Sequence, residues 1–365
     1  MIYLDNAATS FPKPESVYDA VYNAMKESGG NAGRSGHKFA TNAGRIIREA
    51  RILCARLFGA ASSDNIVFTS NTTTALNIAI KGSLSPGDHV ITSMMEHNSV
   101  SRPLNHMDVT ISKLPELNPG DIKKALKPNT KLIVCAHISN VTGEVNNIDE
   151  IGLFCRENDI MFLADAAQSA GTRHIDVRYV DMLAFPGHKG LFGPQGTGGL
   201  YIRPGIHLKT IIEGGTGSWS ESLSQPDNIP SRFESGTLNT PGLAGLATGI
   251  RFIFETGIEE IEHKEKTLTN RIINGIETIK GVRLIGKPGA GVVSVCFDKM
   301  SPAEAALIMD ASFNIAVRSG LHCAADAHAH LGTLAGGGTL RISPNYFNTE
   351  SDIDHCLMAL EACSK

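Results

Sequence analysis

Short apolar runs bounded by turn residues recur through the first half of the chain, with helix-like stretches between them. Strands buried on both faces read as continuous apolar runs, and strands that alternate with helices form parallel sheets. The pattern therefore predicts an α/β fold with a mostly parallel sheet. The predicted strands are 66–70, 88–94, 131–135, 160–164, 181–185 and 198–202. The predicted crossover helices are 43–58, 72–81, 121–127 and 146–158.

The length of the chain and a change of pattern near residue 250 predict two domains. At 365 residues, the chain exceeds the roughly 250 to 300 residues at which a single hydrophobic core stops growing. The segment 213–241 is rich in Gly, Ser and Pro and long for a passive connection, so we interpret it as a functional loop. Helical and alternating stretches follow it, which are typical of a smaller α+β domain. We expect a large domain at 13–250 and a small domain formed by 1–12 and 251–365.

Composition and charge exclude several classes of protein. Hydrophobic residues make up 42% of the chain and charged residues 19%, as in ordinary globular proteins. No apolar run reaches the roughly 20 residues that a membrane-spanning helix needs. A net charge of -4 without a basic run gives no support for a nucleic-acid partner. The first residues show neither a basic leader nor an apolar signal core, so we expect a cytoplasmic protein.

The cysteines show neither a CxxC pair nor the spacing of a zinc ribbon. Their odd number in a large chain favours free thiols over a disulfide framework, and we expect no metal site. A lone cysteine is most often an inert core thiol. The seven cysteines stand at 54, 135, 155, 296, 323, 356 and 363.

Polar residues follow several predicted strands at the point where each strand ends. Ligands of open parallel sheets bind beyond the carboxyl ends of the strands. Thr72 and Thr73 open a helix after the first strand, where free N–H groups and the helix dipole favour a phosphate, although such residues are also ordinary N-caps. Asp165 and Gln168 follow the fourth strand. A carboxylate there could keep a pyridinium nitrogen protonated, or simply cap the next helix.

A lysine follows the fifth predicted strand, in the run Phe185-Pro-Gly-His188-Lys189-Gly. A lysine between glycines at a strand end is poorly explained as a solvated surface charge. A Schiff-base role suits a lysine whose pKa falls in a partly buried site. The order of phosphate segment, Asp-x-x-Gln and His-Lys is more specific than any one of these elements.

With these residues in order, the chain resembles the class V aminotransferase group of fold-type I pyridoxal-phosphate enzymes. Within that group it resembles the cysteine desulfurases close to the SufS-like and selenocysteine-lyase branch. The resemblance covers nearly the whole chain. Its further motifs are Tyr3-Leu-Asp5-Asn-Ala-Ala8-Thr9, Asn31-Ala-Gly-Arg34-Ser-Gly-His37, Glu96-His97-Asn98, Arg318-Ser-Gly-Leu-His322-Cys323-Ala324 and Arg341-Ile-Ser-Pro-Asn-Tyr-Phe-Asn348.

The resemblance implies that pyridoxal 5'-phosphate is the cofactor and is held covalently by Lys189. Asp165 would pair with the pyridine nitrogen and His97 would stack on the ring. Gln168 and Asn140 would contact the ring oxygen and the substrate side. The phosphate would be held by Thr72, Thr73 and His188.

The implied reaction takes sulfur from L-cysteine and leaves L-alanine and a persulfide on Cys323. Lys189 would move the α-proton, and His97 would assist as a proton shuttle. Cys323 stands beside His322 and near Arg318, which we expect to favour the thiolate. The planar guanidinium of Arg341 would bind the substrate carboxylate. Ala8, Asn140 and Arg318 would also lie beside the substrate.

Thr237 matches a threonine that reaches the phosphate of the neighbouring subunit, which implies a homodimer. The chain departs from the family pattern in two places. Pro186 stands where many relatives have a Ser or Thr that binds phosphate, so this contact is lost or is supplied by Thr237 of the partner subunit. Ala325 and Asp326 follow the cysteine where SufS-like chains commonly have a proline, which leaves the rigidity of the loop and the sulfur acceptor open.

Other functions remain compatible with parts of this pattern. A selenocysteine lyase, an epimerase or a class V aminotransferase would use the same cofactor site, although the cysteine motif disfavours a plain aminotransferase. Preference for sulfur or for selenium, as in L-selenocysteine, cannot be inferred from these residues. A metal-binding module is a different class, suggested by His322, Cys323, His328 and His330, but their spacing matches no zinc pattern. A catalytically silent scaffold is disfavoured by the nearly complete set of cofactor residues. The acceptor protein, SufE-like, a small carrier or a tRNA-modifying enzyme, stays unidentified.

Overall fold

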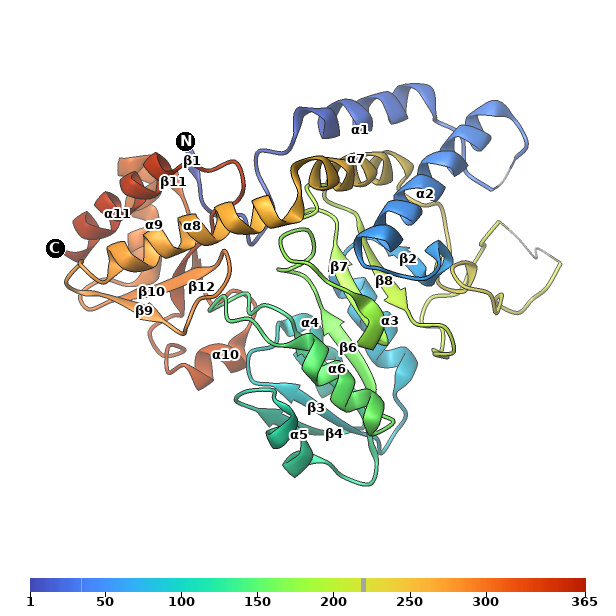
Figure 1. Ribbon diagram of the computed structural model, residues 1–365, viewed down its shortest axis with the longest axis horizontal. Coiled ribbons are helices and arrows are strands. Elements are labelled where there is room, and N and C mark those ends of the chain that lie inside the picture. Colours follow the sequence, from blue (N-terminus) through green and yellow to red (C-terminus); the bar gives the residue numbers. More distant parts are fainter. Residues whose placement is uncertain (34, 218–220) are drawn as a thin grey trace.

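The computed structural model of the chain describes residues 1–33, 35–217 and 221–365. Arg34 of the second family motif and residues 218–220 of the predicted functional loop lie outside the described residues. The chain forms a large part around a seven-stranded sheet and a smaller part around a four-stranded sheet, and both labelled ends lie on the smaller part (Figure 1). Helix α8 runs from the junction of the two parts along the smaller one.

The large sheet has the strand order β2-β8-β7-β6-β5-β3-β4. Its central pairings, from β7 through β6, β5 and β3 to β4, are parallel, whereas β8 is antiparallel to both of its neighbours. The sheet is therefore mostly parallel, as predicted. The strands are β2 (Ile66–Thr69), β3 (His89–Ser93), β4 (Thr110–Leu114), β5 (Thr130–Ala136), β6 (Met161–Asp165), β7 (Met182–Pro186) and β8 (Gly198–Ile202).

Both faces of the large sheet are buried. In β5, Ile133 and Cys135 pack into one apolar cluster, while Leu132 and Val134 pack into another on the opposite face. Helices α2, α6 and α7 contribute to the first cluster, and α3 and α4 to the second. This double burial explains the continuous apolar runs of the sequence. The helices of the large part are α1 (Glu15–Glu27), α2 (Lys38–Leu57), α3 (Thr72–Ser83), α4 (Asn98–His106), α5 (Pro119–Ala125), α6 (Ile148–Glu157) and α7 (Thr240–Thr256).

The smaller part combines the C-terminal third of the chain with its first residues. Its antiparallel sheet has the order β12-β13-β10-β9. Strand β1 (Ile2–Tyr3) pairs with β11 (Ile315–Ala316), and Leu4 is buried in the core of this part. The remaining elements are α8 (Ile258–Ile276), β9 (Val282–Ile285), β10 (Val293–Phe297), α9 (Pro302–Phe313), β12 (Arg318–Gly320), α10 (Ala325–His330), β13 (Thr339–Ile342) and α11 (Glu350–Ser364).

In the large part, the sequence predicted all six of the apolar strands but missed strand β4 and helices α1 and α4. Strand β4 lies at the edge of the sheet and is only partly buried, and α4 carries Pro103 inside a short helix. In the described part of 213–241, regular structure is confined to a short 3-10 turn at Ser231–Phe233 and the start of α7. The domain boundaries 13–250 and 251–365 stay a prediction.

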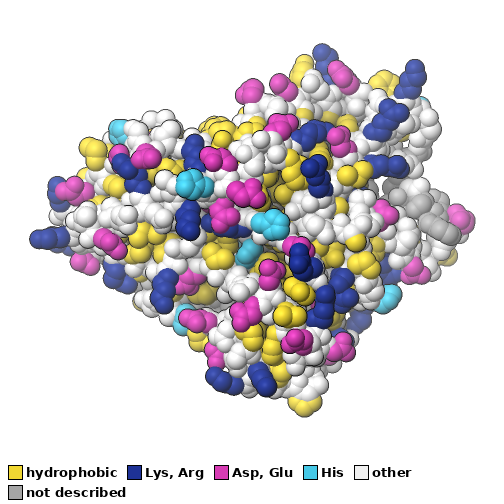
Figure 2. All heavy atoms as spheres, in the orientation of Figure 1, with side chains coloured by type: hydrophobic (Ala, Val, Ile, Leu, Met, Phe, Trp, Pro, Cys, Tyr) yellow, Lys and Arg dark blue, Asp and Glu magenta, His cyan; other side chains and the backbone are white. Residues whose placement is uncertain are grey.

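Charged side chains of both signs are interspersed over the face shown in Figure 2. Among the described residues, no helix combines the length and the apolar character needed to cross a membrane.

Candidate active site

A cavity of about 200 Å³ lies at the carboxyl ends of the central strands of the large sheet. It is the place where a parallel sheet of this kind binds ligands. The large part contributes Asp165 at the end of β6 and Lys189 after β7, and the smaller part contributes Arg341 from β13. The other predicted residues that line it are Ala8, Thr72, Thr73, His97, Asn140, Gln168, His188 and Arg318.

Lys189 and Asp165 are charged groups in an environment that disfavours charge. Burial, with a smaller contribution from the charge of Arg341, lowers the pKa of Lys189 to about 8. Burial raises the pKa of Asp165 to about 6. Asp165 is only 4% exposed, and its Oδ1 accepts a hydrogen bond from Ala167 N at 2.8 Å. A lysine that is partly neutral near neutral pH can act as a nucleophile or base, and a buried carboxylate can bind a cationic ring nitrogen.

Glycines allow the segment around Lys189 to pack closely against neighbouring loops. A Cβ atom at Gly187 would overlap the side chain of Thr197, and one at Gly190 would overlap the carbonyl of Ala170. Gly187 N donates to Thr197 O at 2.8 Å, which continues the pairing at the end of β7. The two glycines therefore fix the course of the backbone that carries Lys189.

The side of the cavity beneath helix α3 has the chemistry of an anion site. Asn71 caps the helix, since its Oδ1 accepts from Thr74 N at 2.9 Å, and the first-turn N–H groups of Thr72 and Thr73 precede any intrahelical partner. His188 lies nearby, with Nδ1 3.1 Å from Thr9 Oγ1, and burial lowers its pKa to about 4. A neutral histidine, two hydroxyls and a helix N-terminus suit a phosphate.

His97 is held by a short chain of hydrogen bonds. Its Nδ1 accepts from Ser99 N at 3.0 Å and lies 2.9 Å from Ser99 Oγ, which in turn lies 2.8 Å from Thr73 Oγ1. Burial and the charge of Lys189 lower the pKa of His97 to about 4. The ring is therefore neutral at physiological pH, with its proton on Nε2. Ser99 was not predicted as a site residue, and its only signal in the sequence is its position two residues after His97.

Arg341 is 1% exposed and already has two partners. Its Nη1 donates to Asn140 O at 3.1 Å, and its Nη2 donates to Asp5 Oδ1 at 2.9 Å. Nε is buried without a hydrogen-bond partner among the described residues. Asp5 thus neutralises one side of the guanidinium and fixes its orientation, a role that the sequence did not suggest. The assignment of Arg341 to a substrate carboxylate stays a prediction.

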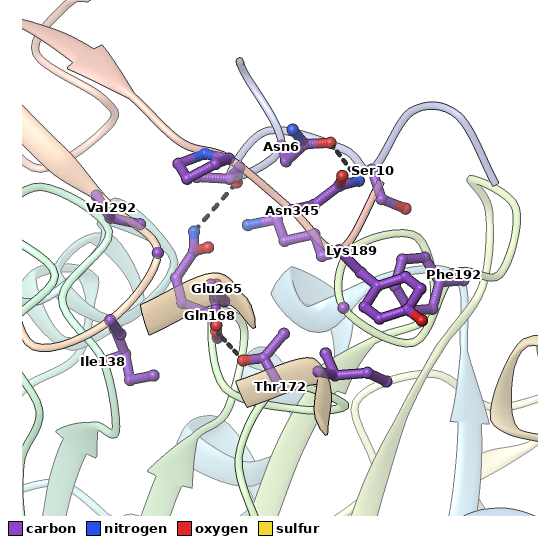
Figure 3. Close-up of a pocket in the computed structure, with 17 residues that line it drawn as sticks. Asn6, Ser10, Ile138, Gln168, Thr172, Lys189, Phe192, Glu265, Val292 and Asn345 are labelled. Carbon is purple, nitrogen blue, oxygen red and sulfur yellow. Dashed lines mark hydrogen bonds between the residues drawn. The ribbon is translucent and has the colours of Figure 1, made fainter. Parts of the chain in front are cut away.

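A second, smaller cavity of about 40 Å³ adjoins the site between the two parts of the molecule. Figure 3 shows Lys189 and Gln168 on its wall together with Glu265 of α8. Gln168 Nε2 donates to Ala7 O at 3.1 Å, and the backbone carbonyl of Gln168 accepts from Thr172 Oγ1 at 3.3 Å (Figure 3). Gln168 therefore borders both cavities and links the strand end to the N-terminal segment.

Cys323 is exposed, whereas five of the other cysteines are buried and Cys296 is intermediate. It lines an outer cavity of about 600 Å³ that shares His97 with the inner one. Arg318, which lines the inner cavity, has its Nη2 3.6 Å from Cys323 Sγ. The thiol therefore stands at the mouth of the Lys189 cavity with the guanidinium of Arg318 beside it.

The expectation that His322 assists the thiolate is wrong. Its side chain is 2% exposed, and its Nε2 lies 2.9 Å from Thr339 Oγ1. Burial lowers the pKa of His322 to about 2, so the ring stays neutral and offers no positive charge. The prediction relied on His322 being next to Cys323 in the sequence, but the side chain of His322 is buried whereas that of Cys323 is exposed.

Of the two histidines after Cys323, His330 is exposed and His328 has a structural role. His328 is fully buried, with Nδ1 2.7 Å from Thr333 Oγ1, and its ring packs against that of His322 with centroids 5.6 Å apart. In the part of the chain that the structure describes, no three His, Cys, Asp or Glu side chains form a group that could hold a metal ion. His322, Cys323, His328 and His330, which suggested a metal-binding module, therefore do not form such a group.

Thr237 lies apart from the Lys189 cavity. It is exposed, lines a different cavity of about 270 Å³, and accepts a hydrogen bond from Asn31 Nδ2 at 3.0 Å. Pro186 ends β7 and is buried. Within one chain, no hydroxyl from either position reaches the phosphate side of the cavity. Contact between Thr237 and a partner subunit stays a prediction.

The sheet and the cavity at its strand ends define an α/β enzyme of the fold-type I class, whose members are generally pyridoxal-phosphate dependent. Residues 2–356 match the family described as Aminotransferase class-V, so the chain belongs to this family.

Sequence and structure similarities to known proteins support this assignment. The chain is 37% identical to a probable cysteine desulfurase of Methanothermobacter thermautotrophicus, over 96% of this chain and 92% of that protein. It is 34% identical to one from Pyrococcus abyssi, over 100% of this chain and 94% of that protein. The apo structure of a cysteine desulfurase from Thermococcus onnurineus NA1 superposes with a TM-score of 0.92 at 32% identity, over 100% of this chain and 94% of that one.

Proposed function

We propose that the enzyme is a cysteine desulfurase that takes sulfur from L-cysteine and receives it on Cys323. The observation that carries this proposal is the exposed thiol of Cys323 at the mouth of the Lys189 cavity, with Arg318 contacting its sulfur at 3.6 Å. A plain aminotransferase has no use for a thiol at this place. The names of the relatives, which are cysteine desulfurases, support the same activity.

We propose pyridoxal 5'-phosphate as the cofactor because the residues present suit its three polar groups. Lys189 would hold its aldehyde carbon, and Asp165, a buried carboxylate with no ion pair among the described residues, would pair with its ring nitrogen. The phosphate would be held by the N-terminus of α3 with Thr72, Thr73 and His188. When bound, this cofactor accepts the electron pair that is left when the α-proton of an amino acid is removed.

The surroundings of Arg341, Lys189 and His97 support a role for each of them in the reaction. Arg341 would hold the substrate carboxylate beside Asn140. The amine of Lys189, with a pKa of about 8, would take the α-proton and return a proton later. The neutral ring of His97 would donate through Nε2 at the cofactor face.

The Cys323 thiolate would attack the sulfur of the bound substrate. A sulfur–sulfur bond forms as the carbon–sulfur bond breaks, and the electron pair of the broken bond stays with the carbon skeleton. That skeleton takes up a proton and leaves as L-alanine. The products are therefore one alanine and one persulfide for each cysteine consumed.

The test is the reaction of the purified holoenzyme with L-cysteine. Mass spectrometry should find one added sulfur on Cys323, and alanine should appear in equal amount. Cys323→Ala should lose persulfide and most alanine formation but keep the change in cofactor absorbance on adding cysteine. Cys296→Ala, which removes the other cysteine that is not fully buried, should behave as wild type. Wild-type alanine production by Cys323→Ala would instead favour a lyase that needs no nucleophile.

We further propose that the enzyme acts as a homodimer and passes its sulfur to an acceptor protein. The exposure of Thr237 and its place in a cavity other than the Lys189 cavity of its own chain support a role across a subunit interface. The exposure of Cys323 supports transfer to an external acceptor. Selenocysteine is the useful contrast substrate, since its selenium is a better leaving group. A cytoplasmic location remains part of the same proposal.

A further inference from the structure

The loop that carries Cys323, residues 321–324 between β12 and α10, has an unusual backbone. His322 and Cys323 both have left-handed conformations, with φ of 47° and 59°. Side chains with a Cβ rarely adopt this region, and two such residues in succession persist only where the surroundings hold them firmly. Contacts that hold this loop therefore determine where the sulfur stands.

The upstream side of the loop is held by residues of the site itself. Asn140 Nδ2 donates to His322 O at 2.6 Å, and Asn98 N donates to Cys323 O at 2.7 Å. The buried ring of His322 is bonded to Thr339. These contacts fix the peptide units up to Cys323 but not the chain beyond it.

On the downstream side, Asp326 at the start of α10 bonds to the large part of the molecule. Its Oδ2 accepts from Lys113 Nζ of β4 at 2.6 Å and from Ser101 Oγ of α4 at 3.2 Å. The apolar residues that the loop and α10 contribute to the neighbouring cluster are the small Ala324 and Ala327, followed by the partly buried Leu331 just beyond α10. From Cys323 to His330 the chain contains no proline that would stiffen it.

Asp326 therefore links the loop to the large part of the molecule. Ser101 belongs to α4, the helix that His97 caps. The same helix thus positions His97 at the inner cavity and, through Ser101, receives the link from the Cys323 loop. Helix α10 lies where the two parts of the molecule meet (Figure 1).

We propose that Asp326 is a positioning residue, which holds Cys323 Sγ at the mouth of the cavity by its bonds to Lys113 and Ser101. This inference rests on the proposed function, because it assigns the link to the step in which Cys323 attacks the substrate sulfur. The pair of Asp326 and Lys113 is half-exposed, with side-chain exposures of 39% and 30%, so it contributes little to global stability. Its removal should loosen the loop while the protein stays folded.

The test compares Asp326→Asn and Lys113→Met with wild-type holoenzyme in single-turnover reactions with L-cysteine. Persulfide formation on Cys323 should slow by roughly five- to tenfold in each variant. The change in cofactor absorbance on adding cysteine, which does not need Cys323, should keep its rate. The double variant should be no slower than either single one, since both remove the same link. Combining Asp326→Lys with Lys113→Asp should restore part of the rate.

A second readout does not depend on activity. The amide of Ala324 is bonded to Leu321 O and that of His328 to Ala324 O, and both should exchange with deuterium faster in Asp326→Asn than in wild type. Glu361→Gln, which removes an exposed ion pair with Lys365 on α11, is the matched control and should change neither readout.

Unchanged hydrogen exchange and an unchanged persulfide rate in Asp326→Asn would overturn the inference. Equal slowing of the absorbance change and of persulfide formation would also overturn it, because the residue would then act on the whole site. If wild type forms no persulfide, the proposed function fails by itself. Exchange in Asp326→Asn still decides whether Asp326 holds the loop.

Discussion

The Lys189 cavity and the Cys323 loop differ in how far they expose their reactive side chains to solvent. The cavity lies at strand ends of a doubly covered sheet, and its charged groups, Lys189 and Asp165, are deeply enclosed. The Cys323 loop lies on the smaller part of the molecule, is exposed, and has a strained backbone held by side chains of the large part. The first region shifts pKa values by burial, whereas the second keeps a thiol accessible.

This difference follows from what each region must do. A base and a cofactor partner gain from a dry, rigid site, in which electrostatic interactions are strong. A thiol that must meet a substrate on one side and an acceptor on the other cannot be buried. The loop is therefore ordered by directed hydrogen bonds from the large part together with the packing of the rings of His322 and His328. Three experiments test this difference between the two regions.

The largest effect is expected for Lys189→Ala. The variant lacks both the covalent attachment and the base, so alanine formation from L-cysteine should fall by about 10³-fold or more. Borohydride reduction followed by mass spectrometry should find the cofactor fixed to wild type and absent from the variant. Hydrogen exchange in the Cys323 loop should stay as in wild type, because among the described residues the hydrogen bonds of that loop go to Asn140, Asn98 and Thr339 and not to Lys189. A cofactor still fixed by borohydride in the variant would move the attachment site elsewhere.

Lys209→Met is the control for this substitution. Lys209 is bonded to Leu84 O and Ser85 Oγ, outside the cavity. The variant should keep its cofactor and its activity. A loss equal to that of Lys189→Ala would indicate general damage to the fold.

Residues at the ends of buried strands were the most predictable part of the site. Continuous apolar runs identified β5, β6 and β7, and strand ends in a parallel sheet converge whatever the details of the loops. Asp165 and Lys189 could therefore be placed together from the sequence. The positions of His97, Arg341 and Cys323 came from the family resemblance, since no local pattern predicts them.

Contacts between residues far apart in the chain could not be predicted. Asp5 meets Arg341 across most of the chain length, and Lys113 meets Asp326 on another element. The edge strand β4, which carries Lys113, was itself missed because its partly exposed residues lack an apolar run. The misassigned role of His322 has the same origin, because only the left-handed backbone shows that its ring turns inward.

The pH dependence of cofactor attachment probes the cavity alone. Only the neutral amine of Lys189 can attack the cofactor aldehyde, and burial brings its pKa down to about 8. Attachment to cofactor-free protein should therefore speed up by about tenfold from pH 7 to pH 9 and then level off. Asp165, with a pKa of about 6, and His97 and His188, with pKa values of about 4, keep one charge state across this range.

Stopped-flow absorbance would measure the rate. A cofactor analogue without the aldehyde is the control, since its binding should lack the rise between pH 7 and pH 9. A rate that stays flat or falls would show that the amine is not the titrating group.

The smallest effect is expected for Thr237→Val. This substitution tests whether one chain supplies all the contacts that the cofactor phosphate needs. If Thr237 of a partner subunit donates a hydrogen bond to the phosphate, its loss should weaken cofactor binding by about fivefold, the usual net effect of one hydrogen bond. The buried Pro186 leaves no hydroxyl at the alternative position, so this chain should depend on the contact. Dissociation constants from cofactor titration, with molecular mass from light scattering, would measure both effects. Asn31→Ala is the matched control, because it removes the partner of Thr237 within the same chain and leaves the hydroxyl in place. An equal loss of affinity in the two variants, or full cofactor affinity in a monomer, would show that the cavity needs no second subunit.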